Sequence, residues 1–329
     1  MTLMANATSS WPTHTLPEAS RDLVRAREAR ARDLGEQLAA DLGDPSQFAT
    51  DIAAAFREVA DPDYRAGQAF VAPGIGPTHG VRTPVQVALR KGFQKASRRA
   101  SPAELLLVAD RLLRVPEREA RWFAITTLQR TLPREPERTW QLLRRAANDA
   151  DDWITVDTLA HPFGKGILAE PYRWAELEQL TVSPSRWERR LVGSTIATIP
   201  FVDRTLGRAP EVVEHGLGLL ATLIGDNEPD VQKALSWAYR SMAMVDQAAT
   251  TAALERQASI AAREHDGHRA WVIRDVLSKL EPAAAAAIKE ALRPIRRRPS
   301  SPATSEAAAL ATRFQEMGLG RRLPEPPLT

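Results

Sequence analysis

The chain has 329 residues, of which 43% are hydrophobic and 26% charged, which is the balance of a folded domain in water. It contains no Cys, so disulfides, thiolate metal ligands and cysteine nucleophiles are excluded, and no apolar run approaches the roughly 18 residues that a membrane helix needs. Forty-four Lys and Arg oppose 41 Asp and Glu, for a net charge of +3. A surface for a polyanion must therefore come from the sorting of charge and not from its excess.

The N-terminal segment, residues 1–20, contains Ser, Thr and Pro without helical periodicity. It also lacks the basic region and apolar run of a secretory signal. We therefore expect a mobile segment here and a cytoplasmic location for the protein.

Helical periodicity dominates the following residues, because apolar side chains recur at three- and four-residue spacing. The clearest segments are 103–113, 119–129, 211–224, 231–242 and 270–280. Ser101, Pro102 and Glu104 have the order of an N-cap, a first-turn Pro and a capping-box Glu. Ser183-Pro184 predicts a similar helix start before Trp187. No series of alternating strands is present, so the fold class is all-α.

A Trp followed three residues later by an Arg occurs three times, at Trp187, Trp237 and Trp271. The intervals are comparable to one helix pair of a HEAT-like array, which takes roughly 40 residues. A helix pair cannot bury its apolar face alone, so pairs stack into a curved solenoid. We therefore expect a HEAT-like helical-repeat solenoid with a concave face. A helical bundle is the alternative architecture.

The composition changes after residue 292, where Arg, Pro and Ser replace the apolar periodicity. Four Arg fall between residues 293 and 298, and a weak helix is expected around residues 305–317. The chain is thus expected to comprise the N-terminal segment 1–20, an ordered domain 21–292 and a basic, Pro-rich tail 293–329. The tail either adds non-specific affinity for a polyanion or is an inert linker.

Trp153 and Asp157 are the residues that most suggest chemistry, because a spacing of four places them on one helix face. An unpaired carboxylate is costly to bury, whereas a carboxylate beside an aromatic ring suits a cationic substrate. The structural alternative is that Asp157 caps a neighbouring helix or pairs with an Arg. Phosphate-binding loops, metal-binding His motifs and serine-nucleophile motifs are absent, and neither a cofactor nor a metal is expected.

Two later segments accompany this pair in chain order, Trp187-Glu-Arg-Arg190 and Gln232-Lys233-Ala-Leu-Ser-Trp237-Ala-Tyr-Arg240. Together with Trp153-x-x-x-Asp157 they resemble the AlkD-like DNA alkylation-repair glycosylases. Gly80-Val-Arg-Thr-Pro84 and the early Tyr64 resemble further features of that family. The resemblance covers roughly residues 50–280.

The resemblance implies a DNA glycosylase whose concave face holds duplex DNA and which excises cationic N3- or N7-alkylated purines. Some relatives act on bulky adducts. It implies that Asp157 is the catalytic carboxylate, flanked by Trp153 and Trp237. Phosphate contacts are expected from five residues: Arg190, with Arg189 as the alternative at this spacing, and Lys233, Arg240 and Tyr64.

The expected partner is duplex DNA with alkylated bases, bound by a monomer associated with the nucleoid. Two other functions stay open on the sequence. One is a non-catalytic helical-repeat scaffold, and the other is a DNA-damage-binding protein without catalysis.

Overall fold

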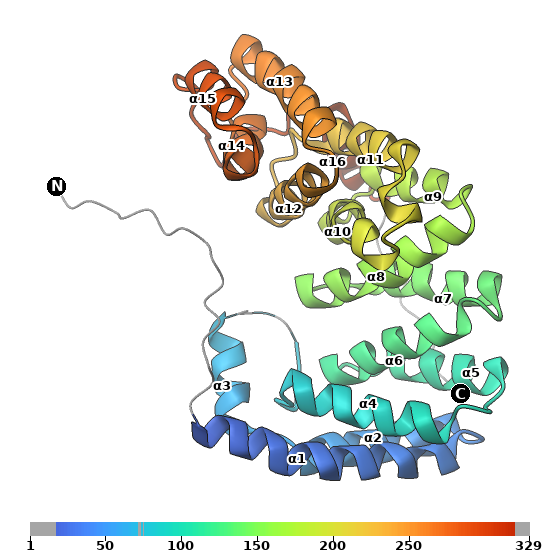
Figure 1. The fold of residues 1–329 in the computed structure, drawn as a ribbon. Helices are drawn as coiled ribbons and strands as arrows, with labels where there is room; N and C mark the ends of the chain where they lie inside the picture. The colour runs from blue at the N-terminus through green and yellow to red at the C-terminus, as the bar shows by residue number, and fades with distance from the viewer. Residues whose placement is uncertain (1–17, 72–73, 75, 320–329) are drawn as a thin grey trace.

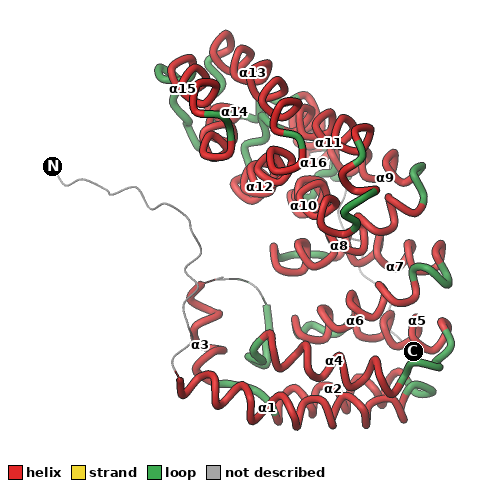
Figure 2. Tube along the Cα trace, in the orientation of Figure 1, coloured by secondary structure: helices red, strands yellow, loops and turns green. Residues whose placement is uncertain are grey.

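A computed structural model describes residues 18–71, 74 and 76–319, and within these ranges all regular structure is helical (Figures 1 and 2). Residues 1–17 and 320–329, which belong to the two expected tails, lie outside the described residues. The all-α prediction is confirmed.

Most of the described α-helices follow one another through short turns (Figure 1), and the connections after α3 and α15 are longer. They are α1 (Glu18–Gln37), α2 (Pro45–Glu58), α3 (Pro62–Val71), α4 (Thr83–Ala96), α5 (Pro102–Leu113), α6 (Arg118–Thr131), α7 (Pro136–Asp149), α8 (Trp153–Ala169), α9 (Arg173–Gln179), α10 (Arg186–Val202), α11 (Pro210–Leu223), α12 (Pro229–Val245), α13 (Gln247–Glu264), α14 (Gly267–Val276), α15 (Pro282–Ala291) and α16 (Glu306–Glu316). Short 3₁₀ turns occur at η1 (Leu38–Asp41), η2 (Leu180–Val182), η3 (Leu206–Arg208) and η4 (Leu277–Lys279).

The five helices predicted from periodicity are present as α5, α6, α11, α12 and α14 with η4. The predicted capping box is also confirmed, because the Ser101 hydroxyl accepts from the Glu104 amide at 3.2 Å while the Glu104 carboxylate accepts from the Ser101 amide at 2.8 Å. The start predicted at Ser183-Pro184 is displaced, since α10 begins at Arg186. The Ser183 hydroxyl instead accepts from the Ser185 amide at 3.0 Å and thereby shapes the turn before the helix.

The helices form two stacked rows (Figure 1). Helices α6, α8, α10, α12 and α14 pack in sequence against one another, and with α4 they make up what we call the inner row. The array bends in Figure 1 so that the inner row lies on the inside of the curve. The apolar core lies between the rows and includes fully buried Phe93, Phe123 and Phe163. Stacked helix pairs of this kind are the predicted helical-repeat solenoid.

Two glycines let α1 and α4 cross in backbone contact. A Cβ on Gly35 would lie 1.9 Å from the Leu89 carbonyl oxygen, and a Cβ on Gly92 would lie 2.0 Å from the Arg32 carbonyl oxygen. No side chain fits at either position. The crossing fixes α4 as the first helix of the inner row.

The segment after residue 292 packs against the array. The Arg274 guanidinium donates to the carbonyls of Leu292 and Ile295, the second at 2.8 Å. Farther on, the Thr304 amide donates to the Gly225 carbonyl at 2.8 Å. Helix α16 then packs on η2 and α11. The boundary expected at residue 292 falls inside a packed region, because Leu292 and Ile295 are buried despite their polar neighbours.

Gly92→Ala should lower the free energy of unfolding by about 1–3 kcal/mol, because its Cβ must displace the backbone of α1. Gly218→Ala in α11 is the matched control, since a Cβ there meets nothing within 4 Å. It should raise the free energy of unfolding by about 0.5–1 kcal/mol through helix propensity. Urea denaturation measures both, and a shift of the same sign in the two variants would contradict the crossing.

Candidate functional site

Asp157 is held in one orientation by three hydrogen bonds across the α8–α10 contact. Oδ1 accepts from Arg190 Nε at 3.1 Å and from the Ser194 hydroxyl at 2.7 Å, while Oδ2 accepts from Arg190 Nη2 at 2.8 Å. A carboxylate offers about four acceptor sites, so one site on Oδ2 stays open. The Asp157 side chain is 22% exposed. The side chain is therefore partly open to solvent.

Arg190 joins three consecutive helices of the inner row. In addition to Asp157 on α8, its Nη1 donates to the Asp230 carbonyl in the first turn of α12 at 2.7 Å. Its side chain is only 8% exposed. Of the two structural alternatives for Asp157, pairing with an Arg is thus present. These bonds hold Asp157 in position, and the phosphate contact expected at Arg190 stays a prediction.

Trp153 is the first residue of α8 and lies one turn before Asp157 on the same helix face. It is 39% exposed. The Asp152 carboxylate caps the helix by accepting from the amides of Ile154 and Thr155 at 2.8 and 2.9 Å. This cap fixes where α8 begins, and so fixes the place of the open indole.

Lys233, Trp237 and Arg240 share one face of α12, at spacings of four and three residues. Lys233 is exposed, and Trp237 is partly buried against the apolar core. Arg240 pairs with Asp275 of α14. Trp237 lies seven residues after Asp230, which is about 10 Å along the helix. The structure thus brings Asp157 and Arg190 into contact, whereas Trp237 stands farther along the neighbouring helix.

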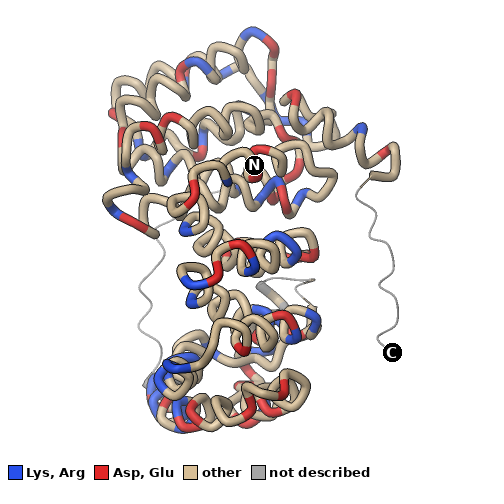
Figure 3. The backbone as a smooth tube through the Cα atoms, turned by 90° about the vertical axis from the view of Figure 1, so that its right-hand side faces the viewer, with Lys and Arg blue, Asp and Glu red and all other residues tan. Residues whose placement is uncertain are grey.

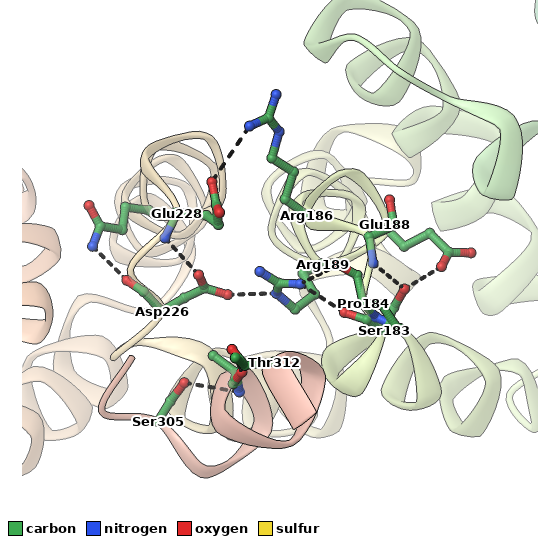
Figure 4. Close-up of polar contacts among 12 residues, drawn as sticks. Ser183, Pro184, Arg186, Glu188, Arg189, Asp226, Glu228, Ser305 and Thr312 are labelled. Carbon is green, nitrogen blue, oxygen red and sulfur yellow. Dashed lines mark hydrogen bonds and ion pairs between the residues drawn. The ribbon is translucent and has the colours of Figure 1, made fainter. Parts of the chain in front are cut away.

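Arg189 is buried, and Figure 4 shows its polar contacts. Its Nε donates to Asp226 Oδ2 at 2.8 Å, and its Nη1 donates to the carbonyls of Ser183 and Pro184 at 2.8 and 3.2 Å. Arg189 therefore joins the turns that precede α10 and α12. With its guanidinium engaged inside the protein, the expected alternative DNA contact at Arg189 is not supported.

Tyr64 lies in a separate cluster near the first helix pairs. The Arg82 guanidinium stacks over its ring at 5.0 Å, and Arg82 Nε donates to Asp61 at 2.7 Å. Tyr64 is partly exposed on α3. Through Arg82, Tyr64 thus lies beside the Gly80–Pro84 segment.

Glu119 of α6 forms hydrogen bonds with the start of the Gly80–Pro84 segment. Its buried carboxylate accepts from the Thr78 hydroxyl at 2.6 Å and from the amides of Gly80 and Val81 at 2.9 and 3.2 Å. Burial acts to raise the pKa of Glu119, but the hydrogen bonds from Thr78 and the backbone, together with Arg118, outweigh it and lower the pKa. The segment therefore depends on an ionised side chain.

Sequence reasoning missed two residues beside Asp157. Ser194 follows Arg190 by one helical turn, and His161 follows Asp157 by one turn on α8. His161 is partly buried and its Nδ1 has no hydrogen-bond partner among the described residues. Burial, followed by the charge of Lys165, lowers its pKa. Both could have been found from the sequence, because each lies four residues after a candidate site residue.

The fold is that of a helical-repeat protein, and the comparisons name the family. Residues 52–280 match the family described as DNA alkylation repair enzyme, and the chain belongs to it. A solved structure described as a predicted DNA alkylation repair enzyme from Enterococcus faecalis is similar, with 17% identity and a TM-score of 0.48. The match covers 60% of this chain and 89% of that one. No curated protein matches.

The helices and the His, Asp and Glu side chains of the described ranges bear on two kinds of partner, membranes and metal ions. No helix among them has the length and apolarity to cross a membrane. No group of three or more His, Asp or Glu side chains in these ranges is arranged to hold a metal ion.

Glu119→Gln should lower the free energy of unfolding by about 1–3 kcal/mol near neutral pH, because it removes a buried acceptor of several hydrogen bonds. Since the folded pKa lies below the ordinary value of 4.5, the contribution of the carboxylate is fully present above about pH 4.5 and is lost as the pH falls through the folded pKa. Urea denaturation from pH 7 to pH 3 should show the two proteins converging in acid. A difference that stays constant with pH would show that ionisation of Glu119 is irrelevant.

Proposed function

We propose that the protein is a DNA glycosylase that excises cationic N3- or N7-alkylated purines from duplex DNA. The observation that carries this proposal is the Asp157 carboxylate, which Arg190 and Ser194 orient with one acceptor site open beside exposed Trp153. A preorganised, partly desolvated carboxylate of this kind stabilises positive charge that develops in a transition state. Membership of an alkylation-repair family supports DNA as the substrate.

The chemistry needs little more than this carboxylate. As the bond from C1′ to the purine nitrogen breaks, its electron pair goes to the base and neutralises it, while the sugar becomes an oxocarbenium ion. Asp157 faces that charge, and its open acceptor site orients a water that attacks C1′ and releases a proton. The base leaves neutral, so no general acid is required. The lowered pKa of His161 keeps an additional positive charge away from this cation near neutral pH.

Trp153 and Trp237 have separate tasks in this proposal. Trp153 lies on the helix face of Asp157, where an aromatic ring stabilises a neighbouring cation by about 0.5–2 kcal/mol. Trp237 stands on α12 with Lys233 and Arg240, where it flanks the bound strand. Lys233, exposed, is the simplest phosphate contact of the three. Arg190 is a positioning residue for Asp157.

A DNA-damage-binding protein without catalysis is the second candidate, and the Asp157–Arg190 ion pair is the observation in its favour. Pairing with Arg190 offsets part of the negative charge that catalysis would use. Incubation with duplexes that carry N7-methylguanine or a bulky N3 adduct separates the two functions. Release of free base supports the glycosylase, whereas tight binding without release supports the damage-binding protein.

Asp157→Asn should reduce single-turnover excision by a factor on the order of 10²–10³, because the shape is kept and the charge is lost. Binding of the same duplex should survive, since a negative charge near phosphates is removed. The free energy of unfolding should fall by about 1–3 kcal/mol, because Arg190 loses its carboxylate. Excision is therefore normalised to folded protein, with circular dichroism as the check.

Asp110→Asn is the matched control for this experiment. Asp110 of α5 also pairs with an Arg, Arg145 of α7. Helix α5 is not one of the inner-row helices, so Asp110 lies outside the candidate site. Its loss should leave excision unchanged. Equal excision by wild type and Asp157→Asn per folded molecule would show that Asp157 serves only the packing of α8 on α10.

A further inference from the structure

Positive charge is concentrated in one part of the chain. Residues 64–103 contain seven Lys and Arg and neither Asp nor Glu. The rest of the chain therefore has 37 Lys and Arg against 41 Asp and Glu, which are the total counts less these seven. Figure 3 shows Lys and Arg positions gathered at the end of the array where α1 and α4 lie. The sorting of charge that a polyanion requires is thus present at α4.

Most of this charge is not neutralised within the protein. Arg82 pairs with Asp61, and Lys95 pairs with Glu36. No carboxylate of the described residues forms an ion pair with the remaining five, which are Arg65, Arg90, Lys91, Arg98 and Arg99. Lys91 is exposed on α4, and Arg98 is exposed in the turn that follows α4.

Arg90 is the unusual member of the set because it is partly buried. Its guanidinium stacks over the ring of Trp122 at 5.6 Å. Its Nε is buried and has no hydrogen-bond partner among the described residues. Burial lowers the pKa of Arg90. A buried donor without a partner is costly, and no hydrogen bond within the described residues occupies the other donors of the Arg90 guanidinium.

Trp122 connects Arg90 to the candidate site. The preceding residue, Arg121, pairs with Asp151 at 2.9 Å, and Asp151 lies two residues before Trp153. Because α6 also packs beside α8, this ion pair places the first turn of α6 near the start of α8, where Trp153 lies. Arg90 on α4 lies one helix farther. Two helix spacings are roughly 16–20 Å, which corresponds to about five base pairs at about 3.4 Å per pair.

We propose that Arg90, stacked on Trp122, forms with Lys91 and Arg98 a phosphate-binding site for the duplex flank about five base pairs from the lesion. This inference rests on the proposed function for the identity of the ligand. The guanidinium donates two hydrogen bonds to a phosphate, and Trp122 holds its plane. Such a contact does not distinguish base sequences, and it should contribute equally to the affinity for damaged and undamaged DNA.

Arg90→Met is the informative variant, because it keeps the apolar stem over Trp122 and removes the charge. Affinity for an undamaged 25-base-pair duplex should fall about 5- to 10-fold at 50 mM salt. The slope of log K against log salt should become shallower by about 1. Arg263→Met on outer helix α13, where Arg263 pairs with Glu264, is the matched control and should bind as the wild type does.

Two further measurements separate a phosphate contact from a structural role. The exposed double variant Lys91→Gln/Arg98→Gln should weaken binding without a change in melting temperature. A duplex with a single lesion, cut to end three base pairs from it on this flank, should abolish the difference between wild type and Arg90→Met. Wild-type affinity and salt slope in Arg90→Met would overturn the proposal and leave Arg90 as a stacking partner of Trp122.

Failure of this proposal is distinguishable from failure of the proposed function. Binding of undamaged duplex is measured without any excision, so an inactive wild type still reports on Arg90. Conversely, single-turnover excision at saturating DNA should be the same in wild type and Arg90→Met. A loss of that rate in folded Arg90→Met would contradict a role confined to the flank.

Discussion

The candidate site depends on the contacts of one buried side chain, Arg190. Its guanidinium bonds to Asp157 on α8 and to the carbonyl of Asp230 on α12, while its backbone belongs to α10. A planar group with donors in a fixed fork can hold three helices in one register, which a Lys ammonium cannot. The orientation of Asp157 is therefore set by the stacking of successive repeats. The candidate site and the solenoid are built from the same bonds.

Helical periodicity and capping chemistry were sufficient to predict the fold, because each pair repeats the same local pattern. The Trp153–Asp157 face followed from spacing alone, and α8 contains both residues. Spacing was a weaker guide to the roles of the adjacent residues Arg189 and Arg190. Neighbours on a helix differ by about 100° in direction, and both positions turned out to be buried. The choice between them depended on Asp226 and Asp157, which come from other repeats.

The C-terminal segment could not be assigned from composition. Arg, Pro and Ser dominate residues 293–305, and this pattern is typical of a tail. The segment is nevertheless packed on the array, because Ile295 is buried and the Thr304 amide donates to the Gly225 carbonyl. Two such residues do not change the overall composition of the segment. Gly225 has no space for a Cβ, which would lie 2.3 Å from the Thr304 hydroxyl oxygen. The partner of each contact is far away in sequence.

These contacts between residues distant in sequence should change how the array unfolds. In a plain solenoid each repeat touches its neighbours alone, so unfolding can begin at an end and proceed repeat by repeat. Here the chain returns from α15 past the turn before α12 to η2, and the Thr304–Gly225 contact spans 79 residues. Opening of the last repeat must break bonds to earlier ones. We therefore expect the helices of the C-terminal half to unfold together and not one pair at a time. Local opening at the C-terminal end should then leave the packing of the helices around Asp157 intact.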